Sequence, residues 1–162
     1  MKNIIVVFFL LSSNFLFSQN LPNFNDIKLD KAIDYKVADS FVLIAANYLL
    51  TTPFNKDDIG RLKSLQFVIK WMSGTPDYTF TLDNAATKIM KESDDLLGIY
   101  MAAMSKYCLK NKVASKDTKA ITLNAVILLL NYCENDNNNI KMTKQLKKLS
   151  EARAKGQLEQ AL

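Results

Sequence analysis

Most of the chain after residue 38 repeats its apolar positions with the period of an α-helix. Helical character begins near Asp30 and becomes strong from Asp39 to Leu50, where the segment Phe41 to Ala46 is apolar on every side. A second run of the same kind spans Val126 to Leu130. Such all-round apolar runs are typical of helices that are buried on most sides. We therefore expect two centrally buried helices in an otherwise amphipathic set.

A one-sided apolar stripe marks the segment that follows Pro53. We expect this stripe to face the core and the remaining polar residues to lie away from it. The stripe consists of Ile59, Leu62, Leu65, Ile69 and Met72, and the residues off it are Arg61, Lys63, Gln66 and Lys70. Asn55 or Asp57 is the expected N-cap of this helix. Gly74 is expected to end it in the left-handed conformation.

The second half of the chain predicts four more helices. The first is short and capped by Asp83, and the next runs from Ser93 to Lys110. A helix capped by Ser115 follows, and a final basic helix covers 140–160, with Met142, Leu146, Leu149 and Ala152 on one side. Short connections between helices favour antiparallel neighbours. The predicted fold is thus all-α: an antiparallel bundle or a short stack of helical hairpins, with five to six helices.

The first 18 residues have the order of a secretory signal peptide. Lys2 gives a basic start, Ile4 to Leu11 is an apolar run, and the small residue Ser18 precedes a polar junction. The apolar run is too short to span a bilayer, which needs about 20 residues. We expect cleavage after Ser18, export to the periplasm or beyond the cell, and no transmembrane segment in the mature chain. A buried N-terminal helix is the alternative.

Composition supports a single helical domain after this signal. Four Gly and three Pro argue against many short strands and turns, and 49% hydrophobic residues suffice for a core. We expect residues 19–38 to hold an irregular lead-in and the start of the first helix, and residues 39–162 to form the domain.

The absence of histidine removes large classes of chemistry. It excludes hydrolases that use an imidazole base and zinc or haem sites with histidine ligands. The adjacent acids Asp57–Asp58 and Asp94–Asp95 project about 100° apart on a helix, so they are interpreted as helix caps. The sequence thus predicts no catalytic residues, no metal site and no cofactor, and an enzyme is the less favoured interpretation.

The two cysteines, Cys108 and Cys133, are the only candidates for a disulfide. In an antiparallel hairpin, Cys108 lies near the turn and Cys133 lies about 25 Å along the next helix at 1.5 Å per residue. A disulfide needs Cα atoms within about 7 Å. We predict free, buried thiols; a bridge would require that these helices do not form a simple hairpin.

The densest aromatic stretch contains Trp71, Tyr78 and Phe80. Tyr78, Phe80 and Leu82 alternate with polar residues, but one short strand forms no sheet alone, so the segment predicts an extended arm packed on the helices. One hypothesis makes the three rings a lip over a groove that binds a peptide or glycan. The alternative is an arm that seals the core.

The formal charge of the chain is +5, and it falls to +4 when the signal peptide with Lys2 is removed; all of this +4 lies at the C-terminal end. Residues 141–162 hold six basic and two acidic residues, including Lys141, Lys144, Lys147 and Lys148. This helix is a candidate for weak contact with an anionic surface. The alternative is a docked helix with a solvated lysine face. Nucleic acid is not an expected partner, because the rest of the exported chain is neutral.

The favoured functional hypothesis is an exported, non-catalytic helical protein. It would act through protein–protein contact or structural support in the bacterial envelope, with another envelope or secreted protein as partner. The alternative is a small-ligand binder or enzyme whose carboxylates and lysines converge only in the fold.

Overall fold

The computed structural model describes residues 21–82, 84–112 and 116–162. Over those ranges all regular secondary structure is helical, which confirms the all-α prediction. The elements are η1 (Phe24–Asp26), α1 (Ala32–Thr51), α2 (Ile59–Gly74), α3 (Asn84–Met90), α4 (Asp95–Lys110), α5 (Thr118–Cys133), η3 (Asp136–Asn138), α6 (Lys144–Ala154) and α7 (Leu158–Ala161). The predicted signal peptide at 1–18 and the predicted caps Asp83 and Ser115 lie outside the described ranges. The described cap of α5 is Asp117, whose carboxylate accepts the Ala120 N–H.

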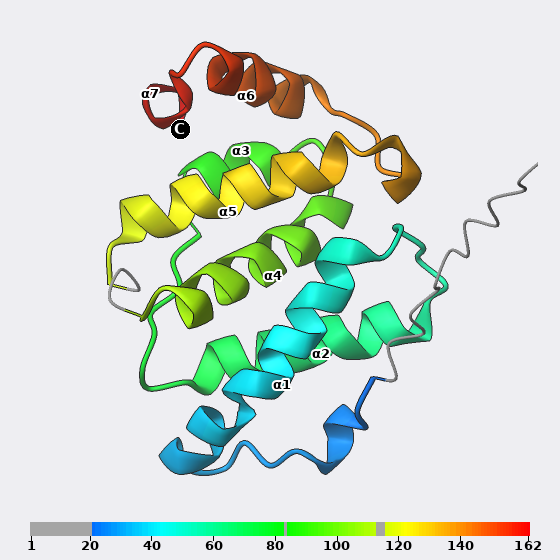
Figure 1. Ribbon diagram of the computed structural model, residues 1–162, viewed down its shortest axis with the longest axis vertical. Coiled ribbons are helices and arrows are strands. Elements are labelled where there is room, and N and C mark those ends of the chain that lie inside the picture. The colour runs from blue at the N-terminus through cyan, green and yellow to red at the C-terminus, as the bar shows by residue number, and fades with distance from the viewer. Residues whose placement is uncertain (1–20, 83, 113–115) are drawn as a thin grey trace, which may run out of the picture.

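Helix α4 occupies the middle of an elongated molecule. Figure 1 shows α6 and α7 at one end of the long axis and η1 with the start of α1 at the other. Between them α4 packs against α5 on one side and α1 on the other, and it also contacts α2 and α3. Helices α1 and α2 form a packed pair, while α3 and α5 contact α6. Elements adjacent in sequence are thus mostly adjacent in space, as short connections require.

The core consists of two buried clusters on either side of α4. Tyr100 and Met104 of α4 belong to the cluster shared with α3, α5, α6 and α7. Ala102 and Leu109, also on α4, belong to the cluster shared with α1, α2 and the segment before α1. Each cluster therefore has its own set of apolar partners, and α4 joins the two.

In the segment after α2, half-buried and exposed residues alternate from Tyr78 to Thr81, as the sequence pattern predicts. The segment forms no regular secondary structure between residues 75 and 82. Tyr78 and Phe80 are half-buried and pack against both core clusters, whereas Thr79 and Thr81 are exposed. The arm thus covers the junction of the two clusters with one side and presents hydroxyls on the other.

Asp58 caps helix α2, so the prediction of Asn55 or Asp57 as the cap is wrong. The Asp58 carboxylate accepts the N–H groups of Gly60 at 2.7 Å and Arg61 at 3.2 Å. The Tyr48 hydroxyl donates to the same carboxylate at 2.9 Å. Asn55 instead accepts the Asp57 N–H in the preceding turn. The carboxylate that also has a partner on α1 is therefore the one that starts the helix.

Gly74 ends α2 without adopting the left-handed conformation, which corrects the second prediction for this helix. Among the described glycines only Gly156 has a positive φ. A Cβ on Gly74 would lie 2.0 Å from the Tyr35 hydroxyl oxygen. Glycine is used here because the start of α1 passes close to the end of α2, not because the backbone needs a special φ.

The buried face of α2 is the opposite of the predicted one. The core side holds Arg61, Ser64, Phe67, Val68 and Trp71. Ile59, Leu62 and Ile69 from the predicted stripe are exposed, and Leu65 and Met72 are half-buried. Both sides of this helix carry large apolar residues, and the side with Phe67 and Trp71 fills the space between α1 and α4.

The predicted helix over 140–160 is broken into two. Residues 140–143 are not helical, and Thr143 caps α6 by accepting the Leu146 N–H. Gly156, with φ of 68°, ends α6: its N–H donates to Arg153 O and the Gln157 N–H donates to Ala152 O. This is the Schellman arrangement, in which a left-handed glycine terminates a helix. The break turns the last residues into α7, which raises the number of described α-helices to seven.

Candidate functional site

An apolar ridge lies on the outward side of α2. Ile59 is 67% exposed, Leu62 is 54% exposed and Ile69 is 38% exposed. Leu62 and Ile69 are seven residues apart, so they project from nearly the same side of the helix. Three large aliphatic side chains are therefore exposed within about three turns of one helix. We call Ile59, Leu62 and Ile69 the α2 ridge.

A groove between α2 and α4 borders the ridge. Its volume is about 220 Å³, and its apolar lining includes Leu62, Leu65 and Ile99. Gly98 allows the two helices to come close, because a Cβ there would lie 2.9 Å from a Leu65 methyl carbon. The groove therefore has an apolar floor in direct continuity with Leu62.

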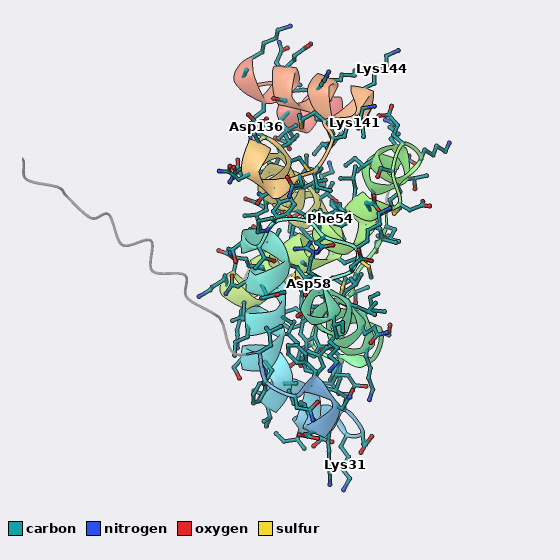
Figure 2. All side chains as sticks on the ribbon, turned by 90° about the vertical axis from the view of Figure 1, so that its right-hand side faces the viewer. Lys31, Phe54, Asp58, Asp136, Lys141 and Lys144 are labelled. Carbon is teal, nitrogen blue, oxygen red and sulfur yellow. The ribbon has the colours of Figure 1, made fainter. Side chains whose placement is uncertain are left out.

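The groove continues toward the start of α6. Phe54, Asn55 and Lys56 also line a second hollow of about 590 Å³, which extends to Lys141. Figure 2 shows Phe54 and Asp58 near the middle of the long axis, with Lys141 toward the α6 end. The two hollows are neighbours, because both are lined by Phe54, Lys56 and Asp95.

Carboxylates dominate the rim of the groove. Asp58, Asp94 and Asp95 line it, each at the start of a helix. Asp95 pairs with Lys56 at 3.0 Å, and Asp58 holds the backbone of α2. Asp94 is exposed and makes no side-chain capping hydrogen bond. The rim thus presents Asp94 as the carboxylate most open to a basic group.

Arg61 forms the polar end of the groove, and its burial was not predicted. Only 6% of the residue is exposed. One guanidinium nitrogen donates to the Thr52 carbonyl at 3.1 Å and to the Thr52 hydroxyl at 3.0 Å. The guanidinium carbon lies 5.3 Å from the Phe54 ring centroid and 5.8 Å from that of Tyr132. Cation–π contacts and hydrogen bonds to Thr52 explain why arginine is tolerated in the core.

The position of Arg61 in the sequence did contain a signal. Arg61, Ser64, Val68 and Trp71 follow the i, i+3, i+7, i+10 spacing of one helix face. The prediction placed every charged residue in solvent, and the buried face that contains Arg61 was therefore not recognised. Arginine can occupy such a face because its aliphatic stem is apolar and its guanidinium packs against aromatic rings.

The predicted aromatic lip is brought together but faces mostly inward. The Trp71 ring centroid lies 5.5 Å from that of Tyr78 and 5.7 Å from that of Phe80. Trp71 is fully buried, and its indole N–H donates to the Tyr35 carbonyl at 3.2 Å. Burial, with the nearby carboxylates of Asp39 and Asp77, raises the pKa of Tyr78 to about 12. Only the outer edges of Tyr78 and Phe80 remain open to a ligand.

A separate cleft of about 510 Å³ lies on the outer side of the arm. It is lined by residues of the arm and of four helices: Thr79, Thr81, Asn84, Met104, Thr118, Lys119, Ile121, Thr122, Glu159 and Leu162. Hydroxyl groups are its most frequent polar groups. Sequence reasoning missed it, because its walls come from segments about 80 residues apart.

The candidate lysines on the C-terminal segment are all exposed. Lys144, Lys147 and Lys148 lie on the side of α6 opposite Leu146 and Leu149, which are buried. Figure 2 shows Lys141 and Lys144 near each other at the α6 end. The segment is docked by its leucines and carries a solvated basic face.

Two glutamates attach α6 to the rest of the molecule. Glu92 accepts the Gln145 N–H at 2.8 Å, and this bond holds the pKa of Glu92 below its ordinary value. Burial opposes ionisation of Glu134, but hydrogen bonds from Ser150 and Arg153 outweigh it and lower its pKa. Arg153 also donates to Asn131. The start and the end of α6 are therefore fixed by different carboxylates.

Both cysteines are free and buried in the structure. Burial raises the pKa of Cys108 to about 11 and that of Cys133 to about 12. Thiols with such pKa values are protonated at neutral pH and are weak nucleophiles. They fill the core cluster of α3 to α7 as small apolar side chains.

Comparisons with known proteins give no relative. No protein-family model matches the chain, and neither the curated proteins nor the solved structures contain a match. Among residues 21–82, 84–112 and 116–162, no helix combines the length and apolarity that crossing a membrane requires. Within the same residues no three potential metal ligands among Cys, Asp and Glu cluster together. The functional argument therefore depends on the surface alone.

Proposed function

We propose that this chain is an exported helical binding protein whose α2 ridge and adjoining groove dock an amphipathic helix of another envelope or secreted protein. The observation that carries the proposal is the exposure of Ile59, Leu62 and Ile69 beside an apolar groove. Exposed contiguous apolar surface is costly in water, and in folded proteins it commonly marks an interaction site. An amphipathic helix in an apolar groove is a frequent mode of recognition.

The energetic contribution of the ridge is of the right size for recognition. Complete burial of a Leu or Ile side chain contributes about 1.5–3 kcal/mol. Leu62 and Ile69 are already partly covered, so a partner gains about 1 kcal/mol from each, and more from the more exposed Ile59. A few such anchors around a groove can dominate an interface.

The charge of the rim indicates the chemistry of the partner. The lining includes the carboxylates of Asp58, Asp94 and Asp95; Lys56 pairs with Asp95, and Asp94 is exposed. A partner helix with leucine-like anchors and a flanking lysine or arginine complements this surface. An acidic partner would meet like charge at the same rim. We therefore assign the groove to a basic amphipathic helix.

The test compares the α2 ridge with an equally exposed apolar residue elsewhere. Leu62→Asp places a charge on the ridge, and Val37→Asp makes the same change on α1, where Val37 is 63% exposed. We expect Leu62→Asp to abolish a partner-containing complex on native gels of the envelope fraction and Val37→Asp to leave it intact. Equal complexes in both variants, with both proteins folded by circular dichroism, contradict the proposal.

Export is tested separately from binding. The order of residues in 1–18 supports a cleaved secretory signal. Intact-mass measurement of protein recovered from the periplasm or the medium should show a chain that begins at Gln19. Recovery of the full-length chain from the cytoplasm would contradict export. That result would not bear on the docking proposal, which the Leu62→Asp variant tests.

A further inference from the structure

The cleft on the outer side of the arm has the size and composition of a small-molecule site. Its volume of about 510 Å³ lies within the roughly 300–1,000 Å³ of known ligand pockets. Its floor includes Met104 and Ile121, which are 1% and 2% exposed. Apolar floors with a few polar groups above them are the usual design of such pockets.

The arm presents hydroxyls to this cleft because its other side is fixed in the core. Tyr78 and Phe80 pack against both core clusters, so the alternate residues Thr79 and Thr81 face outward. Thr118 lines the cleft from the start of α5. A hydroxyl both donates and accepts hydrogen bonds, so these groups suit a ligand with donors and acceptors together.

Two opposite charges stand on different elements of the cleft. Lys119 belongs to α5 and Glu159 belongs to α7. Both residues are exposed, and among the described ion pairs none includes either of them. A ligand that carries one positive and one negative group can satisfy both, whereas an ion of one sign leaves the other charge without a partner.

We propose that this cleft binds a small zwitterion with apolar side groups, in the class of apolar dipeptides. The ligand carboxylate pairs with Lys119, its ammonium group pairs with Glu159, and its side chains rest on Met104 and Ile121. The threonine hydroxyls bond the amide between them. This site shares no residue with the α2 ridge. The zwitterion proposal and the docking proposal are therefore tested independently of each other.

The charges are solvent-exposed, so the expected effects are moderate. A dipeptide of this class should bind with a Kd on the order of 0.1 mM. Removing one exposed charge partner should weaken binding about fivefold. Blocking both ligand charges should therefore weaken it by at least about tenfold.

The test titrates the purified protein with L-leucyl-L-leucine and with its N-acetylated, C-amidated form, and follows the Met104 methyl signal by NMR. Lys119→Met and Glu159→Gln remove the proposed partners. Lys147→Met and Glu151→Gln make the same changes on exposed residues of α6 and are the matched controls.

We expect the free dipeptide to shift the Met104 signal with a Kd that rises in Lys119→Met and Glu159→Gln but not in the controls. Equal binding of the blocked dipeptide overturns the proposal. So does equal weakening in control and cleft variants, or no shift at about 10 mM, which is about a hundred times the expected Kd.

Discussion

Helices α2 and α6 have similar sequence patterns and opposite outcomes. Each carries an apolar stripe with basic residues off it. In α6 the stripe is buried at Leu146 and Leu149, and the lysines are exposed, as predicted. In α2 the predicted stripe is exposed at Leu62 and Ile69, and Arg61 is buried.

The difference between the two helices arises from the residues on the face opposite the predicted apolar stripe. Opposite its leucines, α6 has only lysines and small or polar residues, so only one face can pack. Helix α2 has two apolar faces, and the one with Phe67 and Trp71 buries the larger aromatic surface against α1. A pattern of apolar positions identifies faces that can be buried, and packing against neighbours selects among them. The unselected face of α2 is the proposed docking surface.

The largest expected effect separates the two faces of α2. Trp71→Ala removes a fully buried ring and its hydrogen bond to Tyr35, and we expect a loss of about 3–5 kcal/mol in the free energy of unfolding. Leu62→Ala removes a half-exposed side chain and should cost less than about 0.5 kcal/mol. Urea denaturation measures both. A loss at Leu62 as large as that at Trp71 would show that the ridge belongs to the core.

Arg61 tests whether a buried charge stabilises the core face. Arg61→Met keeps the apolar stem but loses two hydrogen bonds and the stacking on Phe54 and Tyr132, so we expect a loss of about 2 kcal/mol. Arg61→Lys should recover less than half of it, because an ammonium group does not stack as a planar guanidinium does. Lys63→Met, on the exposed side, is the control. Full recovery by lysine would contradict this account.

Gly156 tests the end of α6. Its φ of 68° strains any residue with a Cβ, although a Cβ there would meet no atom within 4 Å. We expect Gly156→Ala to cost about 1 kcal/mol and Gly156→Asn to cost less, because asparagine tolerates the left-handed region. Thermal denaturation distinguishes the two. A gain in stability in Gly156→Ala would contradict the break, because alanine is more stable than glycine inside a continuous helix.

Acid should loosen α6 before it affects the buried segment Phe67 to Trp71 of α2. Glu92 and Glu134 have folded-state pKa values below their ordinary value of 4.5. Their contribution is therefore complete above about pH 4.5 and is lost as the pH falls through the lower folded values. Hydrogen-exchange protection of α6 amides should decrease in this range, while that of the buried segment Phe67 to Trp71 of α2, which lies beyond the Asp58 cap, is retained. Glu92→Gln should lower protection at the start of α6 already at neutral pH. Parallel loss in both helices would contradict this separation.

The sequence was sufficient to predict the fold class and the buried face of a helix that has only one apolar face. It was insufficient where a helix has two apolar faces or where a contact depends on another helix. The existence of six helical segments and the arm at Tyr78–Phe80 followed from periodicity alone. The choice of Asp58 as a cap depended on Tyr48 of another helix, and the use of Gly74 depended on the approach of Tyr35. The groove and the cleft were not predictable, since their walls join distant segments such as Thr79 and Glu159.

The most direct measurement of the central claim is site-specific photo-crosslinking in living cells. A benzophenone amino acid replaces Leu62 on the ridge or Val37 on α1, and mass spectrometry identifies the crosslinked peptide. We predict an adduct from position 62 only, joined to a basic amphipathic helical segment of another exported protein. Equal adducts from both positions, no adduct from 62, or a crosslink to a second copy of this chain would contradict the account.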